Sequence, residues 1–221
     1  MRTIRALMIA TAIVGTLPTV VTAQAGRQFA DSWFWGIKTG GITMADSGGA
    51  YRQSPFAGID WLITRNHGGL YVSGAETFFT RRAFILRDPN AGLDSGVRAI
   101  DLKNMRKLDV AVMGFPGDFL RFHPYVGGGF TFSEIVDAQA EGPFSSTDQS
   151  DFADQVILDH RASFSPFFIA GGQYRLARAS VFGQATLSPA QQNFILYNGR
   201  PYNFSFEFGL RYNFGTSISR E

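Results

Sequence analysis

The sequence predicts an all-β protein, an eight-stranded antiparallel up-and-down transmembrane β-barrel, and three observations support this prediction. Residues 202–214 alternate without interruption between large apolar side chains and small, amide or charged ones. This period of two indicates a β-strand, and an aromatic face opposite a small polar face is typical of a strand between lipid and a hydrated barrel interior. The 221 residues include 25 Gly and 22 Phe, which suits curved strands with an aromatic exterior. Long and short connections also alternate along the chain, as they do in outer-membrane barrels.

The amino-terminal residues 1–23 have the three-part layout of a secretory signal peptide. Two arginines precede an apolar run, and small residues follow at Ala23 and Ala25. Cleavage is predicted after Ala23, with Ala25 as the alternative, and residues 24–221 are predicted to form a single barrel domain. The other interpretation is a membrane anchor, but the apolar run is short and contains a Gly and a Pro.

Eight segments of strand length are predicted, separated by clusters of turn residues. They span residues 33–44, 55–64, 70–81, 97–113, 122–136, 163–176, 180–188 and 202–214. The expected connections are long near residues 45–54, 82–96, 138–162 and 189–200, and short near residues 65–69, 114–120 and 177–179. Three short turns and four long loops are what eight strands with both termini on one side require.

The first three segments are recognised by alternation and by the turns between them. A Ser-Gly-Gly loop follows the first segment, and the Gly68–Gly69 pair permits the tight turn between the second and the third. In the second segment Trp61 is expected on the outer face and Asp60 in the interior. In the third segment Tyr71 is expected outside and Glu76 inside.

The fourth segment, residues 97–113, is strongly charged on one face. Its predicted inner face contains Asp101, Lys103, Lys107 and Asp109. Its predicted outer face contains Ile100, Leu102, Leu108, Val110 and Val112. Arg106 interrupts the outer face, so the sequence predicts a β-bulge there or a position above the bilayer.

The last four segments show the same division. Residues 122–136 set phenylalanine and valine against glycine and hydroxyl side chains, and residues 163–176 set Phe164, Phe168 and Tyr174 against Gln173 and Arg175. Residues 180–188 form a short strand after the brief connection 177–179, and residues 202–214 close the barrel.

Charged residues on the predicted inner faces are expected to form a mutually neutralising network. An eight-stranded barrel is narrow enough for side chains to fill it, and a buried charge must be paired or hydrated. The alternative is a narrow ion path gated by the same pairs. The residues expected inside are Lys38, Asp60, Glu76, Lys103, Lys107, Asp109, Arg175, Glu207 and Arg211.

Aromatic residues are expected to form girdles where the barrel crosses the two membrane–water interfaces. The residues assigned to these girdles are Trp33, Trp35, Trp61, Tyr71, Tyr174 and Tyr212. A soluble barrel of the lipocalin type is the alternative fold, but it would turn the aromatic face of residues 202–214 toward its interior.

Three stretches resemble small bacterial outer-membrane β-barrels, the OmpA-like or porin-family eight-stranded barrels. They are residues 105–113 with 122–130, residues 168–174 with 181–184, and residues 207–214. The last stretch is similar to the carboxy-terminal insertion signal read by the barrel assembly machinery, polar-x-Gly-x-x-aromatic-x-aromatic. The signal residues are Glu207, Gly209, Tyr212 and Phe214.

The resemblance implies a place in the cell outer membrane, with periplasmic termini and with outer-membrane lipid, lipopolysaccharide and the barrel assembly machinery as partners. A monomer is favoured. One departure is that seven residues follow Phe214, whereas the insertion signal usually ends the protein. The resemblance specifies architecture and export and not an activity.

The composition points to few chemical roles. The net charge is +2 and basic residues do not cluster with interleaved aromatics, so no nucleic-acid partner is predicted. No catalytic residue, metal site or cofactor is assigned. The predicted function is a largely closed barrel with a structural or surface-interaction role. The alternatives are a small-solute or ion channel and a lipid-modifying enzyme, for which His160 beside Asp159 and Ser163 is the candidate.

Overall fold

The computed structural model describes residues 29–45, 51–85, 98–117, 121–144, 146–197 and 201–216. The segment 1–23, predicted to be a signal peptide, lies outside the described residues, as do both of its possible cleavage sites. The single helix found among the described residues is too short and too polar to cross a membrane.

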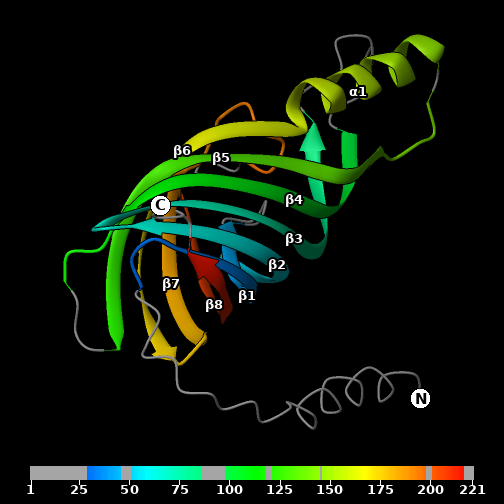
Figure 1. Ribbon diagram of the computed structural model, residues 1–221. Helices are drawn as coiled ribbons and strands as arrows, with labels where there is room; N and C mark the ends of the chain where they lie inside the picture. The colour runs from blue at the N-terminus through cyan, green and yellow to red at the C-terminus, as the bar shows by residue number, and fades with distance from the viewer. Residues whose placement is uncertain are drawn as a thin grey trace, which may run out of the picture.

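Eight antiparallel strands close into one barrel, which confirms the predicted fold class (Figure 1). The elements in chain order are β1 (Ser32–Ala45), β2 (Tyr51–Arg65), β3 (Gly68–Ile85), β4 (Arg98–Gly114), β5 (Phe122–Ala140), α1 (Thr147–His160), β6 (Ala162–Leu176), β7 (Ala179–Pro189) and β8 (Tyr202–Thr216). Each strand pairs with its neighbours in sequence, and β1 pairs with β8 from Ser32↔Thr216 to Thr43↔Phe204. Because β1 pairs with β8, the sheet is closed and has no unpaired edge strand where these two strands meet.

The two ends of the barrel differ. We call the end where β1 begins and β8 finishes the terminal end, and the opposite end the loop end. Tight hairpins lie at the terminal end, where Asn66 and Ala177 adopt positive φ angles of 42° and 74°. Positive φ at the turn is what a two-residue hairpin needs to match the twist of its strands.

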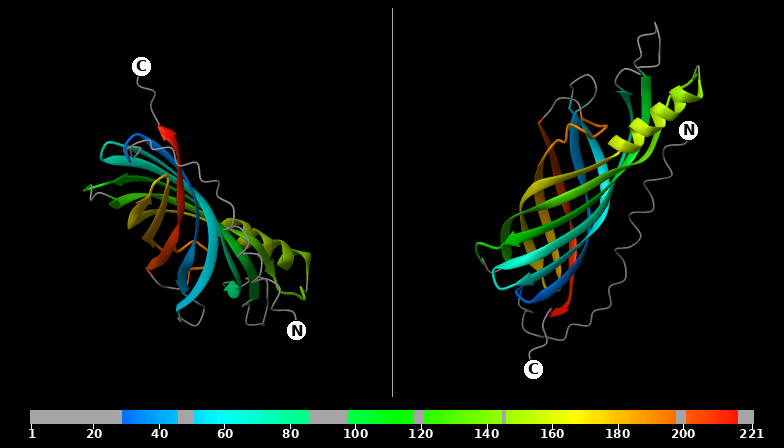
Figure 2. Two further views of the ribbon diagram at one scale, coloured as in Figure 1. Left: turned by 60° about the horizontal axis from the view of Figure 1, so that its bottom comes forward. Right: turned by 90° about the horizontal axis from the view of Figure 1, so that it is seen from above.

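Strands β3, β4 and β5 rise above the rest of the barrel at the loop end (Figure 2). The β2–β3 pairing stops at Phe56↔Thr77, whereas the β3–β4 pairing continues to Ile85↔Arg98. We call residues 78–85, 98–103 and 137–140 the extension. The predicted third and fifth segments ended at residues 81 and 136, because the alternation of apolar and polar residues weakens in the extension.

The predicted loop 138–162 contains helix α1, so this part of the prediction was wrong. Ser146 caps the helix by accepting a hydrogen bond from the Gln149 amide at 3.4 Å. Ala153 and Ile157, one turn apart, are buried against the loop end of the barrel. The helix was missed because its acidic, weakly amphipathic sequence gives little periodic signal, and its position depends on this tertiary contact.

In β4 the division between inner and outer faces changes phase at Asn104, which has a φ of 54°. The β3–β4 register shifts at the same level, between Thr77 and Thr80. Below the shift, Leu108, Val110 and Val112 face outward as predicted, but above it Ile100 and Leu102 are fully buried. Their predicted outward placement was wrong, because a one-residue change of phase moves every later side chain to the other face.

Candidate functional site

A buried network of charged and polar side chains fills the middle of the barrel. Lys38 Nζ lies 2.8 Å from Glu207 Oε2 and 3.8 Å from Asp109 Oδ2, and it donates a hydrogen bond to Ser73 Oγ at 2.9 Å. Lys107 Nζ lies 3.3 Å from the same Asp109 oxygen. The ammonium and carboxylate groups of Lys38, Asp109 and Glu207 are almost completely shielded from solvent, so their charges must compensate each other.

Arg211 forms the second centre of this network and is completely buried. Its guanidinium meets Asp60 through two nitrogens, with Nη2 at 2.9 Å and Nε at 3.1 Å from Oδ2. It donates to Gln173 Oε1 at 3.0 Å, and its Cζ lies 3.7 Å from the centre of the Phe182 ring. A planar guanidinium suits both this two-point pairing and the stacking on an aromatic face.

Gln184 connects the two centres. Its amide nitrogen donates to Glu207 Oε2 at 2.7 Å and to the Tyr71 hydroxyl at 3.0 Å, and its oxygen accepts from Tyr125 at 2.8 Å. Six charged residues take part in these contacts, three cations and three anions, and all of them except the partly exposed Lys107 are buried. They are Lys38, Lys107, Arg211, Asp60, Asp109 and Glu207. The positive and negative charges of this network therefore balance each other.

An apolar cluster fills the lumen at the terminal end. Phe29 stacks on His123, with ring centroids 4.0 Å apart, and meets Phe115 edge-on at 4.8 Å. Phe34, Leu62, Met113, Phe167 and Ile169 are buried in the same cluster. These side chains therefore occupy the space within the strands at this end.

A second apolar cluster lies at the loop end. Ile100, Leu102, Met105 and Ile135 are buried beneath Ala153 and Ile157 of α1. The β7–β8 connection adds Phe194, Ile195 and Leu196, and the amide of Ile195 donates to the His160 carbonyl at 2.8 Å. This bond ties the end of α1 to the β7–β8 connection, so two separate segments meet at the loop end.

Most residues predicted inside the barrel lie there, but Glu76 and Lys103 do not. Glu76 lies on the outer surface of β3, 3.4 Å from the Arg106 guanidinium, and Lys103 lies on the outer surface of β4, 3.8 Å from Asp137. Asp101 also faces outward, 3.6 Å from Arg82. The inner face of β3 carries the odd-numbered residues 71, 73 and 77, and the phase change at Asn104 turns Lys103 and Asp101 outward. Arg175 lies half-exposed near the end of β6, on the same face as Gln173.

Tyr71 was predicted in an interface girdle and is instead fully buried in the polar network. The other girdle candidates lie on the outer surface, where Trp61 packs against both Trp33 and Trp35 with ring centroids 5.6 Å apart. Sequence reasoning missed Tyr71, Gln184 and Ser73 as network members. Their inward positions follow from strand alternation, but the partner of each one depends on register across strands that are distant in sequence.

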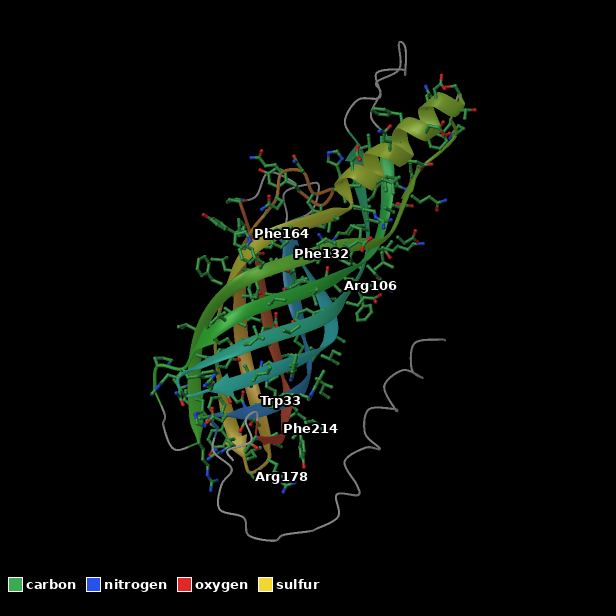
Figure 3. All side chains as sticks on the ribbon, turned by 45° about the horizontal axis from the view of Figure 1, so that its top comes forward. Trp33, Arg106, Phe132, Phe164, Arg178 and Phe214 are labelled. Carbon is green, nitrogen blue, oxygen red and sulfur yellow. The ribbon has the colours of Figure 1, made fainter. Side chains whose placement is uncertain are left out.

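Figure 3 shows the aromatic residues of the outer surface near both ends of the barrel, with Phe132 and Phe164 toward α1 and with Trp33 and Phe214 at the opposite end. Between them the outward residues are large and apolar, including Leu108, Val110, Val126, Phe168 and Leu210. A continuous apolar band of this kind on the outside of a closed barrel is the surface that faces lipid. Above the band, ion pairs join Arg106 to Glu76 and Arg161 to Glu134 on the outer face.

The candidate residue for lipid chemistry is His160 in helix α1. His160 lies at the end of α1, and its Nδ1 is 2.9 Å from the carbonyl of Val156 in the same helix. The described residues contain no group of three or more His, Asp or Glu side chains able to hold a metal ion. Glu141 at the start of the acidic connection pairs with Arg82.

No family model and no curated protein sequence matches this chain. Among solved structures, the chain is similar to Neisserial surface protein A, with a TM-score of 0.51 and 9% sequence identity over 82% of this chain and 97% of that one. The fold is that of the small outer-membrane β-barrels. Ail of Yersinia pestis also matches (TM-score 0.46, 10% identity, 84% of this chain and 99% of that one). So does the N-terminal barrel domain of OprF from Pseudomonas aeruginosa (TM-score 0.43, 13% identity, 85% and 100%).

Proposed function

We propose that this chain is a non-conducting protein of the outer membrane, with a structural or surface-interaction role. The observation that supports the proposal best is the occupied lumen, which has an apolar cluster at the terminal end and a network of paired charges in the middle. An ion on this path would have to cross the apolar cluster at the terminal end and displace a paired charge, and both steps are costly.

The part of the protein available for surface interaction is the loop end. In this proposal the terminal end faces the periplasm after removal of a signal peptide, and the extension with α1 stands outside the cell. The outer apolar band contacts membrane lipid, and the ion pairs around Arg106 and Arg161 lie at the level of the lipopolysaccharide headgroups. Glu207, Gly209, Tyr212 and Phe214 serve as the insertion signal for the barrel assembly machinery.

Conductance in planar bilayers tests the closed lumen. The mature chain is first checked for a folded gel band whose migration changes on boiling. It is then expected to give no discrete conductance steps. The variant Glu207→Gln disturbs the interior pair with Lys38, and Glu134→Gln is the matched control on the outer surface. Steps in the unmodified protein that change with Glu207→Gln and not with Glu134→Gln would establish a pore and refute the proposal.

Lipid turnover is the separate test of the enzymatic alternative. Purified protein in vesicles that contain lipopolysaccharide is expected to leave the acyl chains unchanged. Acyl transfer or hydrolysis that disappears in His160→Ala would show that the protein is an enzyme.

A further inference from the structure

Three arginines at the rim of the terminal end are exposed and lie apart from acidic side chains. Arg65 ends β2, Arg121 directly precedes β5, and Arg178 lies in the hairpin between β6 and β7. None of the three forms an ion pair with an acidic side chain in the described part of the chain. Asp31, just before β1, is the one acidic residue that the structure describes at this rim. The described part of the terminal rim therefore has an excess of positive charge.

The loop end has the opposite arrangement. Each exposed cation that forms an ion pair on its outer face meets at least one carboxylate. The pairs join Arg82 to Glu141 and Asp101, Lys103 to Asp137, Arg106 to Glu76, and Arg161 to Glu134. Helix α1 adds four aspartates to this end. The uncompensated positive charge is therefore a property of the terminal rim and not of the whole barrel surface.

An open groove of about 460 Å³ follows the outer face of β8 toward this rim, and its exposed lining is almost wholly apolar. The apolar side chains that line it are Trp35 and Ile37 of β1, Ile59 of β2, Ala179 of β7, and Leu210, Tyr212 and Phe214 of β8. Arg211 also borders the groove, but its guanidinium is buried in the lumen, where it pairs with Asp60. The groove therefore suits a hydrocarbon chain.

Arg178 lies at the end of the groove that is nearest the rim. Its carbonyl accepts a hydrogen bond from the Asn213 amide at 2.8 Å. Asn213 lies between the groove residues Tyr212 and Phe214, and Ala179 is opposite Tyr212 across the β7–β8 pair. Figure 3 shows Arg178 beyond Phe214 at this end of the barrel. An arginine at the edge of an apolar surface keeps its guanidinium in the polar layer while its aliphatic part covers hydrocarbon.

A phosphate joined to a hydrocarbon chain matches this combination of an arginine and a groove. Arginine binds phosphate through directed, charge-assisted hydrogen bonds. In a zwitterionic lipid the headgroup amine offsets the phosphate charge, whereas an anionic phospholipid has no such amine. A second copy of this chain would instead bring the same arginine to a symmetric interface, where like charges repel.

We propose that this site binds an anionic phospholipid, with the phosphate on Arg178 and one acyl chain in the groove over β8. The positive charges of Arg65 and Arg121 on the same rim favour an anionic headgroup further. The inference rests on the membrane position in the proposed function, and it is independent of whether the lumen conducts. With the terminal end toward the periplasm, the bound lipid belongs to the inner leaflet of the outer membrane.

Tryptophan fluorescence of the protein in vesicles tests the proposal, because Trp35 lines the groove and packs against Trp61, which also meets Trp33. The chain has no other tryptophan. Phosphatidylcholine vesicles contain an equal fraction of either brominated phosphatidylglycerol or brominated phosphatidylcholine. The anionic lipid is expected to quench more strongly, with a relative affinity of about two- to fivefold. High salt is expected to reduce this preference.

Two matched variants locate the site. Arg178→Gln removes the charge beside the groove without breaking an ion pair to a described residue, so it is expected to fold and to lose most of the preference. Arg82→Gln removes the same charge from the loop end and is expected to keep the preference. Glycerol 3-phosphate, a headgroup without an acyl chain, is expected not to relieve the quenching.

Three results would overturn the proposal while the membrane position stands. They are equal quenching by the two lipids in the unmodified protein, an unchanged preference in Arg178→Gln, and relief of quenching by glycerol 3-phosphate, which would indicate a site for free phosphate. Quenching by neither lipid would refute the membrane position of the proposed function together with this inference.

Discussion

At the residue scale, the most informative side chain is Lys38, because it joins β1 to β3 and β8 through buried contacts. Its ammonium touches Glu207, Ser73 and the Tyr71 hydroxyl, and only 1% of its side chain is exposed. A lysine in this position is tolerable only because its partners are fixed by the same barrel wall. The contacts of Lys38 therefore depend on the register of the strands as well as on the identity of the residues.

Replacing Lys38 with Met tests the importance of this pairing. The change leaves the carboxylates of Glu207 and Asp109 buried with fewer positive charges, so we expect a loss of about 3–5 kcal/mol in the free energy of unfolding. Urea unfolding of the folded protein in detergent or vesicles measures it.

Lys103→Met is the matched control. Lys103 also pairs with an aspartate, Asp137 at 3.8 Å, but more than half of each side chain is exposed. A loss of less than about 1 kcal/mol is expected for an exposed pair. Equal effects of the two changes would contradict the interior and exterior assignments of these lysines.

At the element scale, β4 shows how a single residue redirects a whole strand. Asn104 has a positive φ, and its side chain reaches the Phe79 amide at 3.4 Å and Glu76 Oε1 at 3.1 Å. Asn tolerates this conformation better than most residues do. The result is that the lower half of β4 has its odd-numbered residues inside, whereas the upper half has its even-numbered residues inside.

Cysteine labelling tests the change of phase. The chain has no cysteine, so single substitutions can be read without interference. A membrane-impermeant maleimide is expected to label Lys103→Cys, which is exposed above the apolar band, and not Leu102→Cys, which is buried. The side chain at position 112 faces outward, toward lipid, so Val112→Cys is expected to react with the maleimide only when the protein is unfolded.

The opposite labelling pattern would contradict the phase change. Reaction at Leu102→Cys with protection at Lys103→Cys would restore the uninterrupted alternation expected from the sequence. The unreactive Val112→Cys in vesicles controls for general accessibility through unfolded protein.

At the scale of the whole molecule, the barrel has an apolar band on its outside, and paired charges and apolar clusters occupy much of its interior. The extension and α1 project from the loop end only, so the two ends of the barrel differ in structure (Figures 1 and 2). A soluble barrel would need the opposite arrangement, with its large apolar residues inside and polar residues outside.

Tryptophan fluorescence tests the position of the barrel in a bilayer. All three tryptophans, Trp33, Trp35 and Trp61, lie together on the outer surface near the terminal end. Lipids brominated near the headgroup are therefore expected to quench the fluorescence more strongly than lipids brominated near the chain ends. Acrylamide in water is expected to quench weakly.

Two other results would contradict this placement. Strong quenching by acrylamide with no effect of brominated lipid would indicate a soluble barrel. Stronger quenching by bromine near the chain ends would place the terminal end too deep in the membrane.

The sequence by itself determined the number of strands, their order, the alternation of connection lengths and the outer face of β8. These features are local, because a period of two and a turn residue are both visible within a few neighbouring positions. The inward placement of Asp60, Glu207 and Arg211 follows from the same periodicity. The division between aromatic and polar faces also identifies lipid as the outer environment.

Only the tertiary structure decided which charges meet, where β4 changes phase and which side chains fill the lumen. Arg211 and Asp60 are 151 residues apart, and Lys38 and Glu207 are 169 residues apart, so their pairing depends on barrel closure and register. Tyr71 and Glu76 were misplaced because the odd-numbered residues of β3 face inward, and Lys103 was misplaced because β4 changes phase at Asn104. Helix α1 and Phe29 became part of the closure only through contacts with distant strands, and no local periodicity predicts such contacts.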